Sequence, residues 1–330
     1  MYESAQHFKA QNSQFLPFYH FINDQVHIQN ILQSQAPLVS IKEINQFRQL
    51  VAKAAVGKYF LIQLGDYNEG FFEDDKHTTN AKLDFMQQLA SFFYKKTGYD
   101  VIQVGQIAGL HTSQNASLLY HEQALTRLDK QTGLHYNLST HFPWLDKHTI
   151  NSIQHINYLK KIANPIALKV GPDTSITNLI KTIDELDPDY LPGRITLIPG
   201  LGSQSIHHLL PQLIEAVNKT QRTVLWSCDP MSGNNETNSS GIKIRELSNI
   251  VEEIKSSFLI HKKMGSKLNA IHLEATYQDV TECVDYESSI CDSVTDFKKT
   301  YKSLAEPRLN YEQTMHVIQS IAKHYVDVIK

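Results

Sequence analysis

The sequence contains little cysteine and little arginine. Its three cysteines, Cys228, Cys283 and Cys291, form no CxxC pair within the 330 residues. This spacing excludes a disulfide framework and a paired-thiolate zinc motif, and it favours reduced thiols in the cytoplasm. Arginine is the usual bidentate ligand of phosphates and carboxylates, so its scarcity predicts few strong anion-binding sites. The arginines are Arg48, Arg127, Arg194, Arg222, Arg245 and Arg308.

The chain also has no long apolar run and no marked excess of charge. No segment approaches the length of a membrane span, and the N-terminus, with Glu3 and Lys9, does not have the pattern of a signal peptide. The formal net charge of -3 argues against binding to nucleic acid or to a membrane surface. We therefore expect a cytoplasmic protein that acts on a small molecule.

Short apolar runs alternate with amphipathic segments along most of the chain, and this predicts βα units. Such units form a parallel sheet, and eight strands that close on themselves form a (β/α)8 TIM barrel, which takes about 250 residues. We expect one barrel domain at 36–330, preceded by an N-terminal arm at 1–35 that is a candidate subunit contact. The strands are expected at 59–65, 101–105, 139–145, 165–171, 195–198, 223–228, 270–275 and 301–305. The helices are expected at 79–97, 114–129, 176–186, 205–218, 245–263 and 311–329.

An open doubly wound sheet is the alternative α/β architecture. Such folds bind nucleotides through glycine-rich turns after a strand. No GxGxxG or Walker sequence follows any of the expected strands. The pattern therefore favours the closed barrel.

Several of the expected strands end in charged residues. The clearest case is 223–235, TVLWSCDPMSGNN, where a buried strand delivers Asp229 to a polar loop. Lys169 lies within an apolar strand, so it requires an ionic partner, Glu274 or Asp229, or else a role in chemistry. Because the carboxyl ends of barrel strands meet at one mouth, these side chains are expected to converge there. The other members of the predicted mouth are Asp66, Glu69, His272, Glu306 and Arg308.

The order of motifs resembles that of the class II 3-deoxy-D-arabino-heptulosonate 7-phosphate (DAHP) synthases. The strings that carry the resemblance include FLIQLGDYNEGF, VIQVGQIAG, ANPIALKVGP, VLWSCDPMSGNN, IHLEATYQDVTEC and EPRLN, and they cover roughly residues 36–320. The resemblance implies a (β/α)8 barrel that condenses phosphoenolpyruvate with erythrose 4-phosphate on a divalent metal, the first step of the shikimate pathway to aromatic amino acids. It also implies a homodimer or tetramer.

The residues at the family's metal-ligand positions differ from the family pattern. Tyr67 stands at the position of the family's Cys, Ser232 at that of its His, and Glu306 at that of its Asp, while Glu274 is retained. Only oxygen donors remain, with Glu274 and Glu306 as the candidate ligands. Oxygen donors suit hard cations, so the resemblance implies either no metal or a weakly bound Mg²⁺ or Mn²⁺.

The positions at which the family binds phosphate are changed as well. Gln106 and Gly200 stand where the family has arginine, and Ser113 to Asn115 replace its KPR triplet. Lys169, Lys243 and Arg308 keep a positive charge at their positions. The candidate substrate-binding residues are Asp66, Glu69, Gln106, Lys147, Lys243 and Arg308, and a one-residue ambiguity leaves the family's Glu-Arg pair at either 146–147 or 147–148.

These changes leave three hypotheses about function. The leading one is a divergent enzyme of specialised metabolism that makes or breaks a carbon–carbon bond in a small carbonyl compound. In it, Lys169 forms a Schiff base or polarises the carbonyl, and Glu274, Asp229 or His272 acts as acid and base. The second is an active DAHP synthase, and the third is a catalytically inactive partner of a true synthase.

Overall fold

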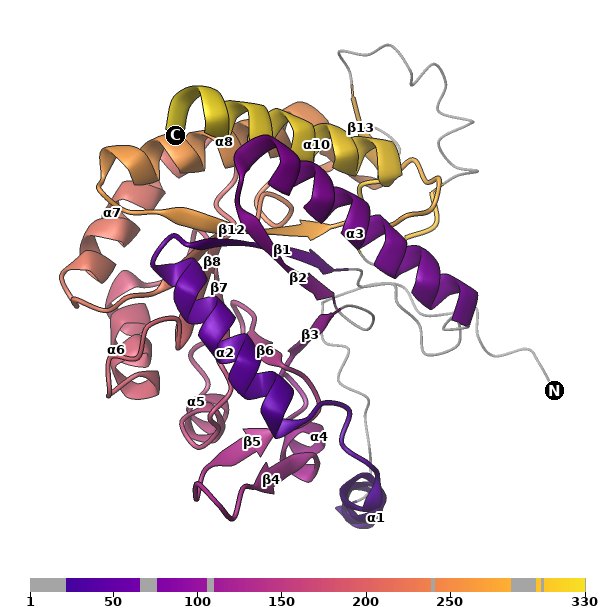
Figure 1. Ribbon diagram of the computed structural model, residues 1–330, viewed down its shortest axis with the longest axis vertical. Helices are drawn as coiled ribbons and strands as arrows, with labels where there is room; N and C mark the ends of the chain where they lie inside the picture. Colours follow the sequence, from indigo (N-terminus) through magenta and orange to yellow (C-terminus); the bar gives the residue numbers. More distant parts are fainter. Residues whose placement is uncertain are drawn as a thin grey trace.

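The computed structural model describes residues 22–65, 76–105, 110–238, 241–285, 301–303 and 306–329. Within these residues, eight parallel strands close into a barrel in the order β1-β12-β9-β8-β7-β6-β3-β2 (Figure 1). The predicted TIM barrel is therefore confirmed. The barrel strands are β1 (Tyr59–Gly65), β2 (Asp100–Gly105), β3 (His111–Asn115), β6 (Phe142–Leu145), β7 (Ile166–Val170), β8 (Ile195–Pro199), β9 (Leu225–Cys228) and β12 (Leu268–Glu274).

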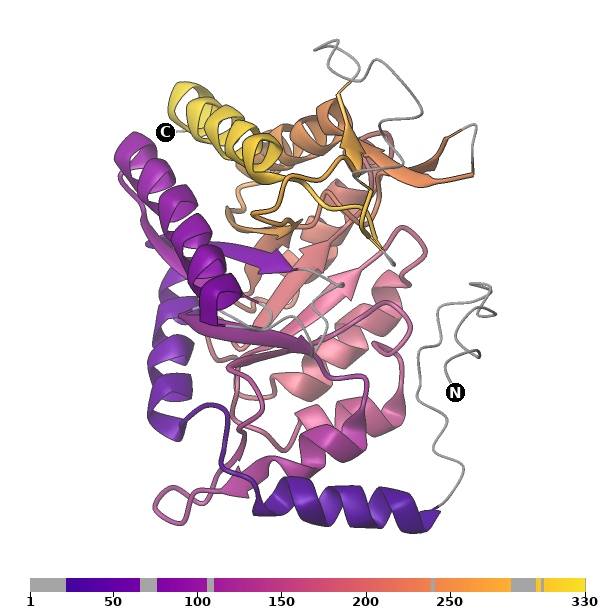
Figure 2. The same ribbon diagram turned by 90° about the vertical axis from the view of Figure 1, so that its right-hand side faces the viewer.

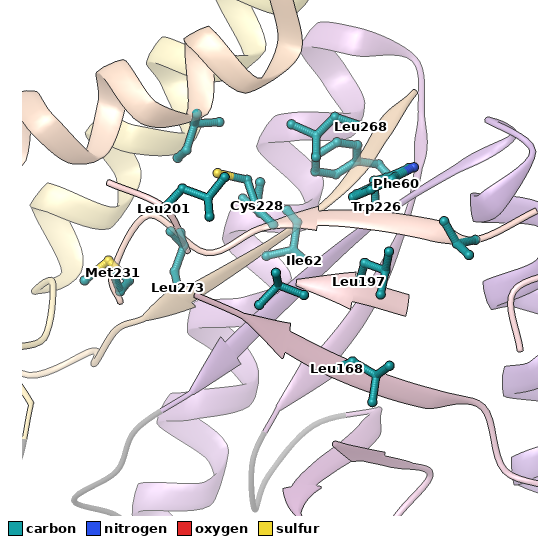
Figure 3. Packing of buried hydrophobic residues seen from close by; sticks show 14 of the residues in the cluster. Phe60, Ile62, Leu168, Leu197, Leu201, Trp226, Cys228, Met231, Leu268 and Leu273 are labelled. Atoms are coloured by element: carbon teal, nitrogen blue, oxygen red, sulfur yellow. The ribbon is translucent and has the colours of Figure 1, made fainter. Parts of the chain in front are cut away.

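Helices surround the barrel, and the main core lies between them and the outward faces of the strands. Strand residues alternate between the two faces: Phe60 and Ile62 point out into this core, whereas Leu61 points into the barrel. Figure 3 shows the outward residues of several strands packed together. The helices are α3 (Lys76–Thr97), α4 (Leu119–Ala124), α5 (Ile153–Leu159), α6 (Ile176–Leu186), α7 (Ile206–Asn218), α8 (Leu247–Lys263), α10 (Tyr311–His324) and η1 (Tyr325–Ile329).

Helix α2 (Ile41–Ala55) closes the N-terminal end of the barrel. It begins with a capping box in which Ser40 and Glu43 satisfy each other's backbone amides. Its buried face, which includes Phe47 and Val51, packs on apolar side chains that point into the barrel, such as Leu61. Figure 2 shows α2 on the side where the strands begin, opposite their arrowheads. Helix α2 therefore covers the barrel interior at this end.

Three small elements are added to the barrel. Helix α1 (Ile22–Ser34) is the described part of the predicted N-terminal arm, and the Arg127 guanidinium donates a hydrogen bond to the Gln33 carbonyl in α1. The strands β4 (Thr126–Leu128) and β5 (His135–Asn137) form an antiparallel pair. A second small sheet joins β10 (Asn235–Thr237), β11 (Lys243–Glu246) and β13 (Cys283–Val284). The predicted division into arm and barrel remains a prediction.

Two of the predicted elements are wrong. In place of the helix predicted over 114–129, the chain forms the end of barrel strand β3, the short helix α4 and strand β4. Residues 301–303, part of the predicted eighth strand, are irregular. The sequence of β3, HTSQN, has no apolar alternation. Its first residue, His111, pairs with Val104 near the end of β2, so β3 begins beside the end of β2 and not beside its start.

No helix of the described residues combines the length and the hydrophobicity that a membrane span requires.

The seating of α2 can be tested at Gly193, which has a φ of +70°. A Cβ at this position would lie 2.7 Å from the Ala52 backbone nitrogen, whereas a Cβ at Gly133, with a φ of +73°, meets nothing within 4 Å. Gly133→Ala should therefore cost only the left-handed strain, about 1–2 kcal/mol. Gly193→Ala should cost about 1–3 kcal/mol more, because α2 must shift. Urea denaturation measures both, and equal losses would show that α2 is not pressed against this loop.

Candidate functional site

The C-terminal mouth of the barrel contains a buried ion pair. Lys169 on β7 lies with its Nζ 3.0 Å from Oδ2 of Asp229, the residue that follows β9. The exposed fractions of the two side chains are 10% and 1%. The same Nζ lies 4.9 Å from the centre of the Trp144 ring on β6, which adds a cation–π contact. Asp229, one of the two partners predicted for Lys169, is therefore at ion-pair distance.

The turn after β9 holds Asp229 in place. Its Oδ1 accepts hydrogen bonds from the backbone amides of Met231 (3.1 Å) and Ser232 (3.2 Å), and its Oδ2 accepts one from the Ser232 hydroxyl at 2.6 Å. Burial alone would raise the pKa of Asp229. The Lys169 ammonium, His272 and the Ser232 hydroxyl outweigh burial, so the pKa lies well below its usual range. Asp229 is therefore an anion, and Ser232 is already engaged as its donor.

His272 and Glu274 on β12 form the second part of the mouth. His272 Nε2 lies 3.6 Å from Glu274 Oε1, and both side chains are buried. Burial and the nearby Lys169 charge lower the pKa of His272 to about 3, so its imidazole is neutral at pH 7. A Cβ at Gly65 would lie 3.0 Å from His272 Nε2 and 3.2 Å from the Glu274 oxygens. The absence of a side chain at Gly65 gives the pair its place against β1.

The barrel strands carry further buried polar side chains, and all of these except His272 were missed by the sequence prediction. Gln63 on β1 donates a hydrogen bond to Ser113 Oγ at 2.9 Å, which links β1 to β3 inside the barrel. Four of their buried polar atoms accept or donate no hydrogen bond within the described residues: Gln63 Oε1, Thr196 Oγ1, Ser227 Oγ and His272 Nδ1. Buried polar atoms are normally satisfied, so these atoms suit bound water or a polar substrate group.

The predicted basic residues are less free than the sequence indicated. The Arg308 guanidinium donates to both oxygens of the buried Glu282, at 2.9 and 2.8 Å. Lys243 Nζ lies 2.7 Å from one oxygen of Glu306, and the Arg245 guanidinium lies 3.1 Å from the other. These positive charges are therefore largely neutralised within the protein.

Lys147 lies near the mouth, because its Cδ is 3.6 Å from the Cβ position of Gly171, just beyond β7. Asp146 accepts a hydrogen bond from Asn115 Nδ2 at 3.1 Å. Four of the predicted site residues lie outside the described residues: Asp66, Tyr67, Glu69 and Gln106.

The described residues do not fit a metal centre. No three His, Cys, Asp or Glu side chains among them gather closely enough to hold a metal ion. Both oxygens of Glu306 face cationic side chains, and the Ser232 hydroxyl donates a hydrogen bond to Asp229. The predicted pair of ligands, Glu274 and Glu306, therefore remains a prediction, and the chemistry proposed below uses no metal.

A closed parallel barrel with ionisable side chains at its C-terminal mouth is the arrangement of a (β/α)8-barrel enzyme. The chain belongs to the class-II DAHP synthetase family, whose model matches residues 3–113 and 109–322.

Curated relatives named phospho-2-dehydro-3-deoxyheptonate aldolase agree with this assignment. The relative from Streptomyces coelicolor is 37% identical over 71% of the present chain. The relatives from Neurospora crassa and Mycolicibacterium smegmatis are each 34% identical, over 79% and 66% of the present chain respectively. These alignments cover 52%, 57% and 48% of the relatives, so the chain spans about half their length. The solved structure of a phospho-2-dehydro-3-deoxyheptonate aldolase from Francisella tularensis has the same fold. Its TM-score is 0.53 at 12% identity, and the match covers 92% of this chain and 97% of that one.

A double-mutant cycle tests the energetic coupling of Lys169 and Asp229. Asp229→Asn leaves a buried ammonium without its counter-ion and should destabilise the protein by about 3–5 kcal/mol. Adding Lys169→Met should restore most of that loss, because the unpaired charge is removed. The exposed pair Lys160–Glu185, at 3.3 Å, is the control, with an expected coupling of about 0–1 kcal/mol. Equal couplings for the two pairs would contradict a desolvated ion pair.

The pH dependence of stability tests the ionisation of Asp229. In the wild type its folded pKa is below the unfolded value of about 3.9, so its stabilisation is present above that pH and is lost as the pH falls further. In Lys169→Met, burial should dominate and raise the folded pKa above the unfolded one. The variant should then gain stability as the pH falls from 7 to 4. Urea titrations between pH 3 and 7 measure the difference from wild type, and a constant difference would refute the assignment.

Proposed function

We propose that this chain catalyses a DAHP synthase reaction, the condensation of phosphoenolpyruvate with erythrose 4-phosphate. Family membership and the names of the curated relatives support this proposal. The observation that carries it is the convergence of Lys169, Asp229, His272 and Glu274 at one end of the barrel. On this proposal the protein acts at the entry to aromatic amino acid biosynthesis, in the cytoplasm and as a homo-oligomer.

The reaction joins two carbon atoms and moves one proton to an oxygen. The C3 methylene carbon of phosphoenolpyruvate attacks the aldehyde carbon of erythrose 4-phosphate, and the aldehyde oxygen takes up a proton. Water then replaces the enol phosphate, which leaves as inorganic phosphate. The site must bind anionic substrates, stabilise negative charge on the aldehyde oxygen and supply that proton.

Lys169 is suited to the first two tasks. Its ammonium lies at the mouth beside the Trp144 ring and is fixed by Asp229, so it can bind a substrate anion or the developing alkoxide without reorganisation. The ion pair with Asp229 favours the charged form of the lysine. This argues against a Schiff base, which needs the free amine.

His272 and Glu274 are suited to proton transfer. A neutral imidazole can accept or donate a proton, and Glu274 lies 3.6 Å from it in the same buried layer. The metal that the family uses has no fitted site among the described residues. Any Mg²⁺ or Mn²⁺ held by Glu274 and Glu306 would be bound weakly.

The comparisons favour the synthase over the leading expectation from the sequence. That expectation was a divergent enzyme of specialised metabolism, whereas the three curated relatives described above carry the name phospho-2-dehydro-3-deoxyheptonate aldolase. One observation still favours a changed activity: the positive charges at Lys243, Arg245 and Arg308 face carboxylates within the protein. A catalytically inactive partner is the remaining candidate, and the assay below separates the three.

The assay follows phosphate release from phosphoenolpyruvate and erythrose 4-phosphate, with Mg²⁺, Mn²⁺ or a chelator in parallel. Wild type should turn over, and Lys169→Met should lower kcat/KM by about 100- to 1000-fold, as the loss of a charge-stabilising donor does. Lys169→Arg should retain part of this charge stabilisation, and Lys161→Met, on the exposed surface, should match wild type. Absence of turnover with these substrates under all conditions would refute the proposal, and turnover of another carbonyl compound would favour the divergent enzyme.

A further inference from the structure

A buried carboxylate outside the mouth contacts both of the loops that shape it. Glu253 lies on the inner face of α8 and has no exposed surface. Its Oε1 accepts hydrogen bonds from the backbone amides of Leu201 (2.9 Å) and Gly202 (3.0 Å). Its Oε2 accepts one from Asn234 Nδ2 at 2.6 Å. Within the described residues Glu253 forms no salt bridge, which is unusual for a buried carboxylate.

The two loops that Glu253 joins are the one after β8 and the one after β9. Asn234 also donates to the Pro230 carbonyl at 2.7 Å and accepts from the Ser203 amide at 3.0 Å. The loops touch through two glycines, because a Cβ at Gly202 would lie 2.7 Å from the Gly233 carbonyl oxygen. Helix α8 and the two loops are therefore held together around one carboxylate.

These loops carry the counter-ion of Lys169. The Asp229 amide donates to the Pro199 carbonyl at 2.8 Å. A Cβ at Gly200 would lie 2.8 Å from Ser232 Cβ and 3.0 Å from the Asp229 carbonyl oxygen. The turn from Asp229 to Ser232 thus has little freedom to move unless the loop after β8 moves with it.

We infer that Glu253 is a positioning residue for the mouth: its carboxylate locks the loops after β8 and β9 so that Asp229 stays in ion-pair contact with Lys169. The inference names a further residue for the proposed synthase reaction and rests on that proposal for its kinetic consequence. Its structural consequence, the contact of Lys169 with Asp229, does not depend on the reaction.

The chemistry of the contact requires a carboxylate. All three groups around Glu253 are N–H donors, so an amide in its place would direct its own NH2 group at Asn234 Nδ2. Asn234 cannot rotate its amide to compensate, because its Oδ1 and Nδ2 are engaged by Ser203 and Pro230. Burial and the nearby Asp229 charge raise the pKa of Glu253 to about 7, although the hydrogen bonds from Leu201, Gly202 and Asn234 act to lower it. The titratable groups that interact with this carboxylate are Cys228, at the end of β9, and Asp229, which follows β9. Burial of this carboxylate is unfavourable, and its three hydrogen bonds offset the cost.

The test compares Glu253→Gln with Glu252→Gln, which removes the same charge from the exposed side of the same helix. Asn234→Ala is a milder variant that keeps the two backbone contacts, should Glu253→Gln fail to fold. The first readout is the rate at which acetic anhydride acetylates Lys169 relative to Lys160, followed by peptide mass spectrometry. The second is the separate effect on kcat and KM.

In Glu253→Gln and in Asn234→Ala, acetic anhydride should acetylate Lys169 at least about threefold faster than in wild type, because the ammonium loses its fixed partner. They should also lower kcat about 10- to 100-fold with a smaller change in KM, as misplacement of a catalytic group does. Glu252→Gln should match wild type in both. Folded variants that lose stability but keep the wild-type acetylation rate would overturn the inference. If Lys169 is acetylated faster in the variants but the wild type does not turn over these substrates, the inference about Glu253 is upheld and the synthase proposal is refuted.

Discussion

The contact on which the site depends is the ion pair between Lys169 and Asp229 at 3.0 Å. Two charges removed from water are costly to bury, and the pair persists only where other groups hold each member in position. Asp229 is fixed by two backbone amides and the Ser232 hydroxyl, and Lys169 lies over the Trp144 ring. The neutral state of His272 follows from the same burial and the same lysine charge. The electrostatics of the mouth therefore originate in one lysine placed on the inner face of β7.

The sequence predicted those parts of the fold and site that combine an apolar run with an abrupt polar ending. Lys169 was noted instead as a charge inside the apolar run of β7, and the catalytic roles of Lys169, Asp229, His272 and Glu274 remain predictions. Strands β1, β9 and β12 have this pattern, and Asp229, His272 and Glu274 come from the last two. Strand β3 does not, because Ser113 faces a polar layer of the barrel interior and no apolar alternation remains to be read. A strand of this kind is specified by its neighbours and not by its own composition.

The sequence prediction missed Thr196, Ser227 and Glu253 for a different reason. Thr196 and Ser227 lie within apolar strands, where a single hydroxyl is compatible with either face of the sheet. Only the closed barrel shows that both point inward. Glu253 lies in helix α8 directly after another glutamate, Glu252, and helical glutamates are usually exposed. Its burial depends on contacts with Leu201 and Asn234, which are distant in the sequence.

Two of the positions at which the sequence resemblance predicts a departure from the family pattern are in contact in this structure. The resemblance predicts that Gly200 stands at an arginine position of the family and Ser232 at a histidine position. Any side chain at 200 would begin 2.8 Å from Ser232 Cβ, so the turn after β9 occupies the space that a larger residue at 200 would need. The shorter serine in turn reaches Asp229 at 2.6 Å and directs its hydroxyl to the carboxylate. Gly200 and Ser232 therefore belong to one arrangement. In it, the turn from Asp229 to Ser232 packs against Gly200, and the Asp229 carboxylate pairs with the Lys169 ammonium.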